Sequence, residues 1–313
     1  PDLSRSGPAS VLSDRLFVDG WRVGGMSATS SLVPKKNAAA FRNYEPSAEH
    51  EAIRAHYKAM REHQTVAFVR RMRAKYCTFE RPMHVWDAIA RLDELVDVSD
   101  PDIALPNSHH LLQTAEALRR DGRPDWMQLV GLIHDLGKIM FTFGCDADGT
   151  SQKCQFGLVG DIFAVGCQLP DACVYPEFNT LSADSNDEKY NTKYGQYEPH
   201  CGIMKLELAW GHDEYLYQVL RNHFANGRGG VGGPLSDDAM AMVRLHSFYP
   251  WHTGNAYEHL ANGANDEHLK EVVRDFNRYD LYSKENTKFN MQELREYYHP
   301  IIVKYLGEGP IYF

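Results

Sequence analysis

Long apolar segments are missing from this sequence, and so is any excess of basic residues. No run approaches the about 20 apolar residues that a membrane-spanning helix needs, so we expect a soluble protein without a membrane partner. The first residues show no basic-then-apolar secretory pattern, which favours a cytoplasmic location. The 33 lysines and arginines are outnumbered by 42 aspartates and glutamates, giving a formal charge of −9. Because nucleic-acid binding relies on clustered basic side chains, this balance argues against a nucleic-acid partner.

Cysteines are too scattered to form a metal-binding or disulfide pattern. None of the six belongs to a Cys-x-x-Cys pair, and their spacing matches neither a zinc ribbon nor a disulfide-rich scaffold. We therefore expect reduced thiols. Histidine, in contrast, is unusually abundant, with 15 residues. A metal bound by this chain would have to be held by histidine and carboxylate side chains.

The composition is that of a folded, helical protein. Hydrophobic residues make up 43% of the chain, which is enough for a substantial core. Residues 1–40 are rich in Ser, Gly and Pro and are predicted to form a flexible N-terminal arm, followed by one domain over 41–313. Apolar residues recur at helical intervals across that domain. Helices are expected near 47–75, 84–96, 108–122, 126–141, 201–224, 236–248, 267–282 and 290–306, the last kinked or divided by Pro300.

Two segments depart from the helical pattern. Residues 142–180 mix Gly, Asp, Cys and aromatics in short runs, which is typical of a loop with a small hairpin. Residues 226–234 form a glycine-rich connector, and no Gly-Lys-Ser/Thr follows that would make it a phosphate-binding loop. The predicted fold class is therefore all-α, a single-domain helical bundle with a small β-hairpin or an irregular insertion.

The strongest chemical feature is the dipeptide His134-Asp135, which lies inside the apolar helix predicted over 126–141. An unpaired carboxylate buried among such residues would be costly. A carboxylate has two oxygens and can bridge two cations, while each imidazole offers one nitrogen donor. We therefore expect a buried metal site at this dipeptide.

Further ligand types follow in a definite order on separate predicted helices. His110 precedes the dipeptide, and His200, His246 and Asp280 follow it, which is the ligand order of the HD-domain superfamily in its two-metal form. A second dipeptide, His212-Asp213, offers the same two types of metal ligand. Since Trp210-Gly211 marks a helix entry, we assign His212-Asp213 either a role in supporting the metal ligands or a structural role, with Asp213 as a first-turn charge.

Several longer motifs carry a resemblance to one family within that superfamily. They are Phe41-Arg-Asn-Tyr44, His63-Gln-Thr-Val66, Ser99-Asp-Pro-Asp102, Pro106-Asn-Ser108, His134-Asp-Leu-Gly-Lys138, Gly211-His-Asp-Glu-Tyr215 and His246-Ser-Phe-Tyr-Pro-Trp-His-Thr-Gly254. Together they resemble the myo-inositol oxygenases from about Phe41 to the C-terminus. Residues 146–155 and 226–234 look like insertions relative to that family.

The resemblance implies a di-iron oxygenase with an HD-domain-like helical bundle. Such enzymes hold two non-haem irons, active as a mixed-valent Fe(II)/Fe(III) pair, and use O₂ to open the ring of myo-inositol to D-glucuronate. By resemblance, His110, His134 and Asp280 would hold one iron, His200 and His246 the other, and Asp135 would bridge them. A monomer is expected.

The resemblance also implies a set of substrate contacts. Lys138 would hydrogen-bond the substrate and favour a lower pKa on its coordinated oxygen, which gives it a catalytic role beside Asp135. Arg42 and Lys284 would close over the site as a lid. The residues expected to bind the polyol are Arg42, Asp97, Lys138, Asp161, His246 and Ser247.

Two other classes of protein share parts of this pattern. An HD-domain phosphohydrolase or phosphodiesterase has the same ligand order, but it needs several Arg or Lys side chains at the phosphate, and chiefly Lys138 lies near the expected ligands. A non-catalytic binding module would keep the helical shell without the complete ligand set. Oxygen uptake with myo-inositol distinguishes the oxygenase from the hydrolase, and metal analysis distinguishes it from the binding module.

Overall fold

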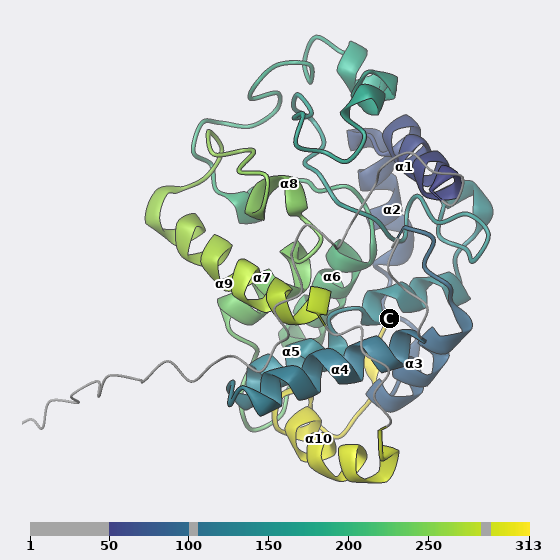
Figure 1. Ribbon diagram of the computed structural model, residues 1–313, viewed down its shortest axis with the longest axis vertical. Helices are drawn as coiled ribbons and strands as arrows, with labels where there is room; N and C mark the ends of the chain where they lie inside the picture. Colours follow the sequence, from purple (N-terminus) through teal and green to yellow (C-terminus); the bar gives the residue numbers. More distant parts are fainter. Residues whose placement is uncertain (1–49, 100–105, 283–288) are drawn as a thin grey trace, which may run out of the picture. The chain divides into compact units, whose positions relative to one another are not determined.

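The computed structural model describes residues 50–99, 106–282 and 289–313, and in this part of the chain the protein is mostly helical (Figure 1). The predicted all-α class is confirmed. The α-helices are α1 (Glu51–His63), α2 (Val66–Tyr76), α3 (Val85–Arg91), α4 (Asn107–Arg120), α5 (Asp125–Ile133), α6 (His212–Ala225), α7 (Asp237–Leu245), α8 (Tyr249–His252), α9 (Gly263–Tyr282) and α10 (Met291–Leu306). Short 3-10 helices are η2 (Leu92–Glu94), η3 (Leu136–Thr142), η4 (Asp146–Asp148), η5 (Pro176–Leu181), η6 (Ala183–Asn186) and η7 (Ile203–Lys205).

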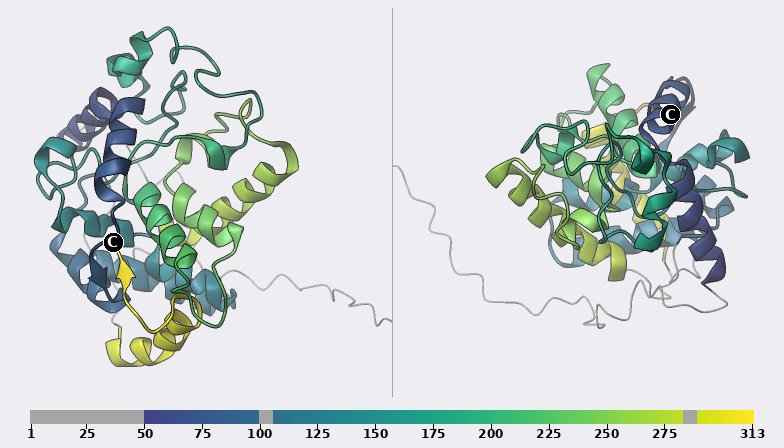
Figure 2. Two further views of the ribbon diagram at one scale, coloured as in Figure 1. Left: turned by 180° about the vertical axis from the view of Figure 1, so that it is seen from behind. Right: turned by 90° about the horizontal axis from the view of Figure 1, so that it is seen from above.

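One small antiparallel sheet joins two distant parts of the chain. Strand β1 (Pro82–Met83) pairs with β2 (Ile311–Tyr312), which Figure 2 shows from behind as a yellow arrow. The expected hairpin within 142–180 is not formed. That region has an irregular path with a single β-bridge from Ala164 to Leu208, so the insertion is of the irregular kind.

Several helix boundaries differ from those that the apolar periodicity predicts. The expected helix over 47–75 is interrupted because Thr65 begins a new helix, its side-chain oxygen accepting a hydrogen bond from the Phe68 backbone N–H at 3.2 Å. The helix expected near 201–224 begins only at His212, after Gly211. Helix α10 runs through Pro300 as one helix, since its residues are helical on both sides.

Helices α4, α5, α6, α7 and α9 form the part of the fold that carries the site. Helix α4 packs along α5, while α7 packs against α5, α6 and α9 (Figure 1). A Cβ added to Gly131 of α5 would lie 2.7 Å from the Leu118 side chain and 3.1 Å from the Ala115 backbone of α4, so the two helices approach closely at this glycine. No helix in the described ranges is long and apolar enough to cross a membrane. The predicted arm over 1–40 lies outside the described residues.

Candidate metal centre

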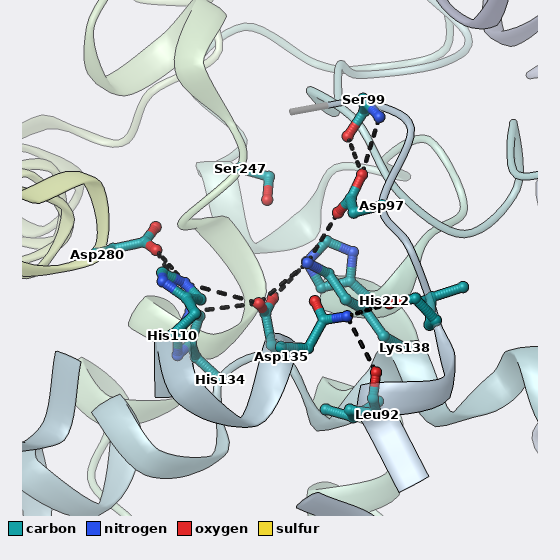
Figure 3. Close-up of polar contacts among 12 residues, drawn as sticks. Leu92, Asp97, Ser99, His110, His134, Asp135, Lys138, His212, Ser247 and Asp280 are labelled. Carbon is teal, nitrogen blue, oxygen red and sulfur yellow. Dashed lines mark hydrogen bonds and ion pairs between the residues drawn. The ribbon is translucent and has the colours of Figure 1, made fainter. Parts of the chain in front are cut away.

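The candidate site forms where several helices bring histidine and carboxylate side chains together (Figure 3). His134 and His246 are the residues that follow the last turns of α5 and α7. His212 begins α6, whereas His110 and Asp280 belong to α4 and α9. The side chains therefore come from five helices, and their arrangement depends on the packing of the whole bundle.

Gly137 brings two of these segments into contact. Helix α5 tightens into η3 directly after Asp135, and a Cβ at Gly137 would lie 2.0 Å from the backbone oxygen of His212. Any side chain would separate η3 from the start of α6. The lack of a side chain at Gly137 therefore explains how His212 comes to lie beside Asp135.

The first group of possible metal ligands surrounds one oxygen of Asp135. The Nε2 atoms of His110 and His134 lie 3.8 and 3.7 Å from Asp135 Oδ2. The same two nitrogens lie 3.0 and 3.4 Å from Oδ1 of Asp280. Two imidazoles and two carboxylates thus face one point, and His110, His134 and Asp135 meet the geometric requirement for a metal site.

The second group surrounds the other oxygen of Asp135. Its Oδ1 lies 3.1 Å from Nε2 of His212 and 3.7 Å from Nε2 of His246. The two imidazole nitrogens are 3.2 Å apart, and the three residues form a second buried group able to hold a metal ion. Each oxygen of Asp135 therefore faces its own group, and the two groups share this carboxylate.

The charge of Asp135 is stabilised by its surroundings. The side chain is 4% exposed, and burial alone would raise its pKa. The charge of Lys138 and the neighbouring histidines instead hold the pKa of Asp135 well below its usual range. Asp135 is therefore ionised, which is the form that binds cations.

Backbone carbonyls fix the orientation of the imidazoles. Nδ1 of His134 donates to the Gly131 carbonyl at 3.0 Å, and Nδ1 of His212 donates to the Leu158 carbonyl at 2.9 Å. A carbonyl can only accept, so in the neutral ring the lone pair is on Nε2, which faces the centre. Nε2 of His134 is buried without a hydrogen-bond partner, a costly state that a bound metal would relieve. The residues present therefore fit a metal.

One predicted ligand lies apart from both ligand groups. His200 is exposed, and its Nδ1 hydrogen-bonds the Ala261 carbonyl at 3.0 Å, so it belongs to neither ligand group among the described residues. His212, which the sequence placed in a supporting or structural role, is the histidine that joins His246 and Asp135 in the second group. The sequence did contain a signal, because Gly211–Tyr215 is one of the motifs that carry the family resemblance, while the segment around His200 is not.

Comparisons with known proteins identify the family of this chain. The profile of the myo-inositol oxygenase family matches residues 50–313. The chain belongs to the myo-inositol oxygenase family. It is 42% identical over 275 residues to the inositol oxygenases of Mus musculus and Homo sapiens, covering 86% of this chain and 90% of each relative. A probable inositol oxygenase of Oryza sativa subsp. japonica is 40% identical over 281 residues, covering 88% of this chain and 86% of that protein.

In this member of the myo-inositol oxygenase family, Lys138 lies between two buried carboxylates. Its Nζ is 2.9 Å from Asp97 Oδ2 and 3.0 Å from Asp135 Oδ2. Although burial alone would lower the pKa of Lys138, the two carboxylates raise it, so the ammonium is retained. Burial would likewise raise the pKa of Asp97, but Lys138 and Ser99 lower it to about 2.

The other predicted substrate residues are buried near this region or lie outside the described chain. Ser247 follows His246 and is 9% exposed. Asp161 is 4% exposed and accepts a hydrogen bond from the Tyr57 hydroxyl at 3.1 Å. Arg42 and Lys284, the predicted lid residues, lie outside the described residues.

Proposed function

We propose that this chain is an inositol oxygenase that uses O₂ to oxidise myo-inositol by four electrons and open its ring to D-glucuronate. One oxygen atom of O₂ enters the product and the other leaves as water, so each turnover needs no external reductant. The observation that carries the proposal is Asp135, whose two oxygens face separate buried histidine groups in a chain of this family.

Two iron ions, as a mixed-valent Fe(II)/Fe(III) pair, are the proposed cofactors. Their nitrogen and carboxylate donors, without thiolate, suit iron. Iron would supply redox capacity and open coordination positions that side chains lack. The proposed ligands are His110, His134 and Asp280 for one ion, His212 and His246 for the other, and Asp135 between them.

Lys138 is proposed to bind a hydroxyl oxygen of the substrate. An ammonium group has three N–H donors, and Asp97 and Asp135 accept two of them. The third can point to the polyol. Because Lys138 holds its proton between two carboxylates, it acts as a donor that stabilises negative charge on the substrate oxygen, and not as a general base.

The remaining proposals concern substrate binding, oligomeric state and cellular location. A neutral polyol offers no charge to hold, so convergent hydrogen bonds must orient it. We propose Asp97, Asp161, His246, Ser247 and Arg42 for this purpose, with Arg42 and Lys284 forming a lid that excludes water. We further propose a cytoplasmic monomer.

The proposal is tested by loading the metal-free protein with Fe(II) without oxygen and adding limited O₂ with myo-inositol. The expected result is oxygen uptake that depends on inositol, with one glucuronate formed per O₂ consumed and two irons bound per chain. The same preparation is offered phosphate monoesters and cyclic nucleotides. Phosphate-ester hydrolysis without inositol-dependent oxygen uptake would contradict the proposed function.

A further inference from the structure

The two groups of possible metal ligands differ in charge. The first includes Asp280, a carboxylate of its own, besides its share of Asp135. The second has two imidazoles, His212 and His246, and only the shared carboxylate. A cation in the second group would therefore have fewer protein ligands and less compensating charge than one in the first.

A further carboxylate lies directly behind the second group. Asp213 has no exposed surface, and its Oδ1 is 3.0 Å from Nδ1 of His246. Its other oxygen, Oδ2, is 3.5 Å from Nε2 of His212. The backbone N–H of Ser247 donates to Oδ1 at 3.4 Å. Asp213 thus touches both histidines of the second group.

Asp213 has no lysine or arginine partner among the residues that the structure describes. Its ion pairs are with histidines alone, and Oδ2 lacks a hydrogen-bond partner. The next residue, Glu214, is equally buried but is paired with Arg73 at 2.9 Å and Arg244 at 2.6 Å. A buried carboxylate without such a partner is costly unless a nearby cation compensates it.

The ring of His246 depends on Asp213 for its orientation. Nδ1 of His246 has three possible acceptors, which are Asp213 Oδ1 at 3.0 Å, the Val243 carbonyl at 3.1 Å and the Met242 carbonyl at 3.2 Å. Among them the carboxylate is the closest and the only charged one. His134 and His212 have neutral carbonyls in this position, so the charged contact distinguishes His246 from them.

We infer that Asp213 is a positioning residue for the second metal ion. It holds the His246 ring with Nε2 toward the centre and supplies, through that ring, the negative charge that the second group lacks. Carboxylates that hold ligating histidines in this way commonly change metal affinity by 10- to 100-fold. The inference rests on the proposed two-metal function and assigns a distinct role to the second His-Asp dipeptide.

The test is a metal titration of the full chain, made metal-free by chelation. Co²⁺ is the probe, because its visible absorption reports the ligands at each site. The wild-type protein is expected to bind two ions. Asp213→Asn is expected to bind one ion as tightly as wild type and the other about 10- to 100-fold more weakly. The matched control is Glu214→Gln, which is expected to lower the thermal stability of the metal-free chain and keep both affinities.

The outcomes separate the inference from the proposed function. Fewer than two ions on the wild-type protein would contradict the two-metal function itself. The inference would be overturned if Asp213→Asn bound both ions with wild-type affinity. It would also be overturned if the affinities of both sites fell equally. If Asp213→Asn does not fold, the titration is repeated with Asp213→Ser. Failure of both variants to fold would give Asp213 a purely structural role and overturn the inference as well.

Discussion

The Nε2 atom of His212 lies 3.1 Å from Oδ1 of Asp135, so the two His-Asp dipeptides of the sequence meet in one buried site. The first dipeptide contributes a histidine to one group and a carboxylate that both groups share. The second contributes His212, which lies directly beside that carboxylate. The same His-Asp dipeptide thus contributes different side chains to the site at its two positions. Only the position of each copy in the fold distinguishes the two contributions.

The first prediction separates His212 from His200. His212→Ala removes a nitrogen donor from the second group, so we expect this variant to bind one metal ion and to lose inositol-dependent oxygen uptake. Its affinity for the second ion should fall more than about 100-fold, beyond the effect of residues that only contact ligands. Metal analysis and an oxygen electrode measure both quantities.

His200→Ala is the matched control. His200 is exposed and bonded to a loop carbonyl, so this variant should keep two ions and wild-type turnover. If His200→Ala lost a metal ion while His212→Ala kept two, the ligand assignment would be wrong.

The sequence was informative about the helical fold and about the ligands that lie on long apolar helices. The dipeptide His134-Asp135 was predicted because it lies in an apolar helix, where a buried charge needs a partner. His110 and Asp280 were predicted from the ligand order that the resemblance implies. The choice between His200 and His212 could not be made in this way. It depends on the close approach at Gly137, a contact between distant segments that leaves no periodic pattern in either of them.

The same reason explains the irregular region. Residues 142–180 were expected to contain a hairpin, but the short apolar runs there pack individually against the core, as Phe156, Leu158 and Phe163 do. Such burial is set by the surrounding helices and not by a local pairing rule. Thr65 shows the opposite case, because its capping hydrogen bond is local and could have been found from the sequence.

The second prediction concerns Gln155, which anchors the segment that carries Asp97. Its Nε2 donates to the Val96 carbonyl at 2.8 Å, and its Oε1 accepts from the Val98 backbone N–H at 3.2 Å. Val96 is 78% exposed, so little apolar packing holds this segment otherwise. Gln155→Ala should raise the KM for myo-inositol about 10-fold, as the loss of one to two hydrogen bonds implies.

Metal binding distinguishes a specific rise in KM from a general loss of structure. Gln155→Ala should keep two metal ions, because the ligand groups are on other elements. The exposed side chain of Gln152 donates to the Glu94 carbonyl at 3.0 Å, while its bond to Gln155 is through its own backbone carbonyl, which alanine keeps. Gln152→Ala should therefore leave the KM unchanged. An unchanged KM in Gln155→Ala would show that Asp97 is held without it, or that Asp97 does not contact the substrate.

The third prediction concerns the Lys138–Asp97 pair. Lys138→Met leaves Asp97 buried without its counter-charge, and we expect the free energy of unfolding to fall by about 3–5 kcal/mol. Turnover should also fall, because the donor to the substrate oxygen is lost. Adding Asp97→Asn to Lys138→Met removes the uncompensated charge and should restore part of the stability without restoring turnover.

Denaturant unfolding of the metal-free variants and glucuronate formation measure the two effects separately. Equal stability losses in the single and double variants would mean that Asp97 is not the carboxylate that Lys138 compensates. Full turnover in Lys138→Met would show that Lys138 has no catalytic role.

The fourth prediction gives the glycine-rich connector a structural role. The backbone N–H groups of Gly230 and Gly232 donate to the carbonyls of Tyr305 and Lys304 at 3.0 and 2.7 Å, which satisfies the C-terminal end of α10. A Cβ on Gly230 would lie 2.0 Å from the Val303 carbonyl oxygen, so the connector can approach the helix only with glycine at this position. Gly230→Ala should lower the free energy of unfolding by about 1–3 kcal/mol, as overpacking does.

Gly309→Ala is the control for this substitution, because a Cβ at Gly309 would meet nothing within 4 Å. We expect its stability to change by less than about 0.5 kcal/mol. Both variants should bind two metal ions, since the connector contacts α10 and none of the metal-ligand groups. If Gly230→Ala were as stable as wild type, the connector would have to move away from α10 without loss, and its contacts there would not stabilise the fold. If it lost metal ions while remaining folded, the connector would act on the site through α6, the helix that begins at His212 and ends just before the connector.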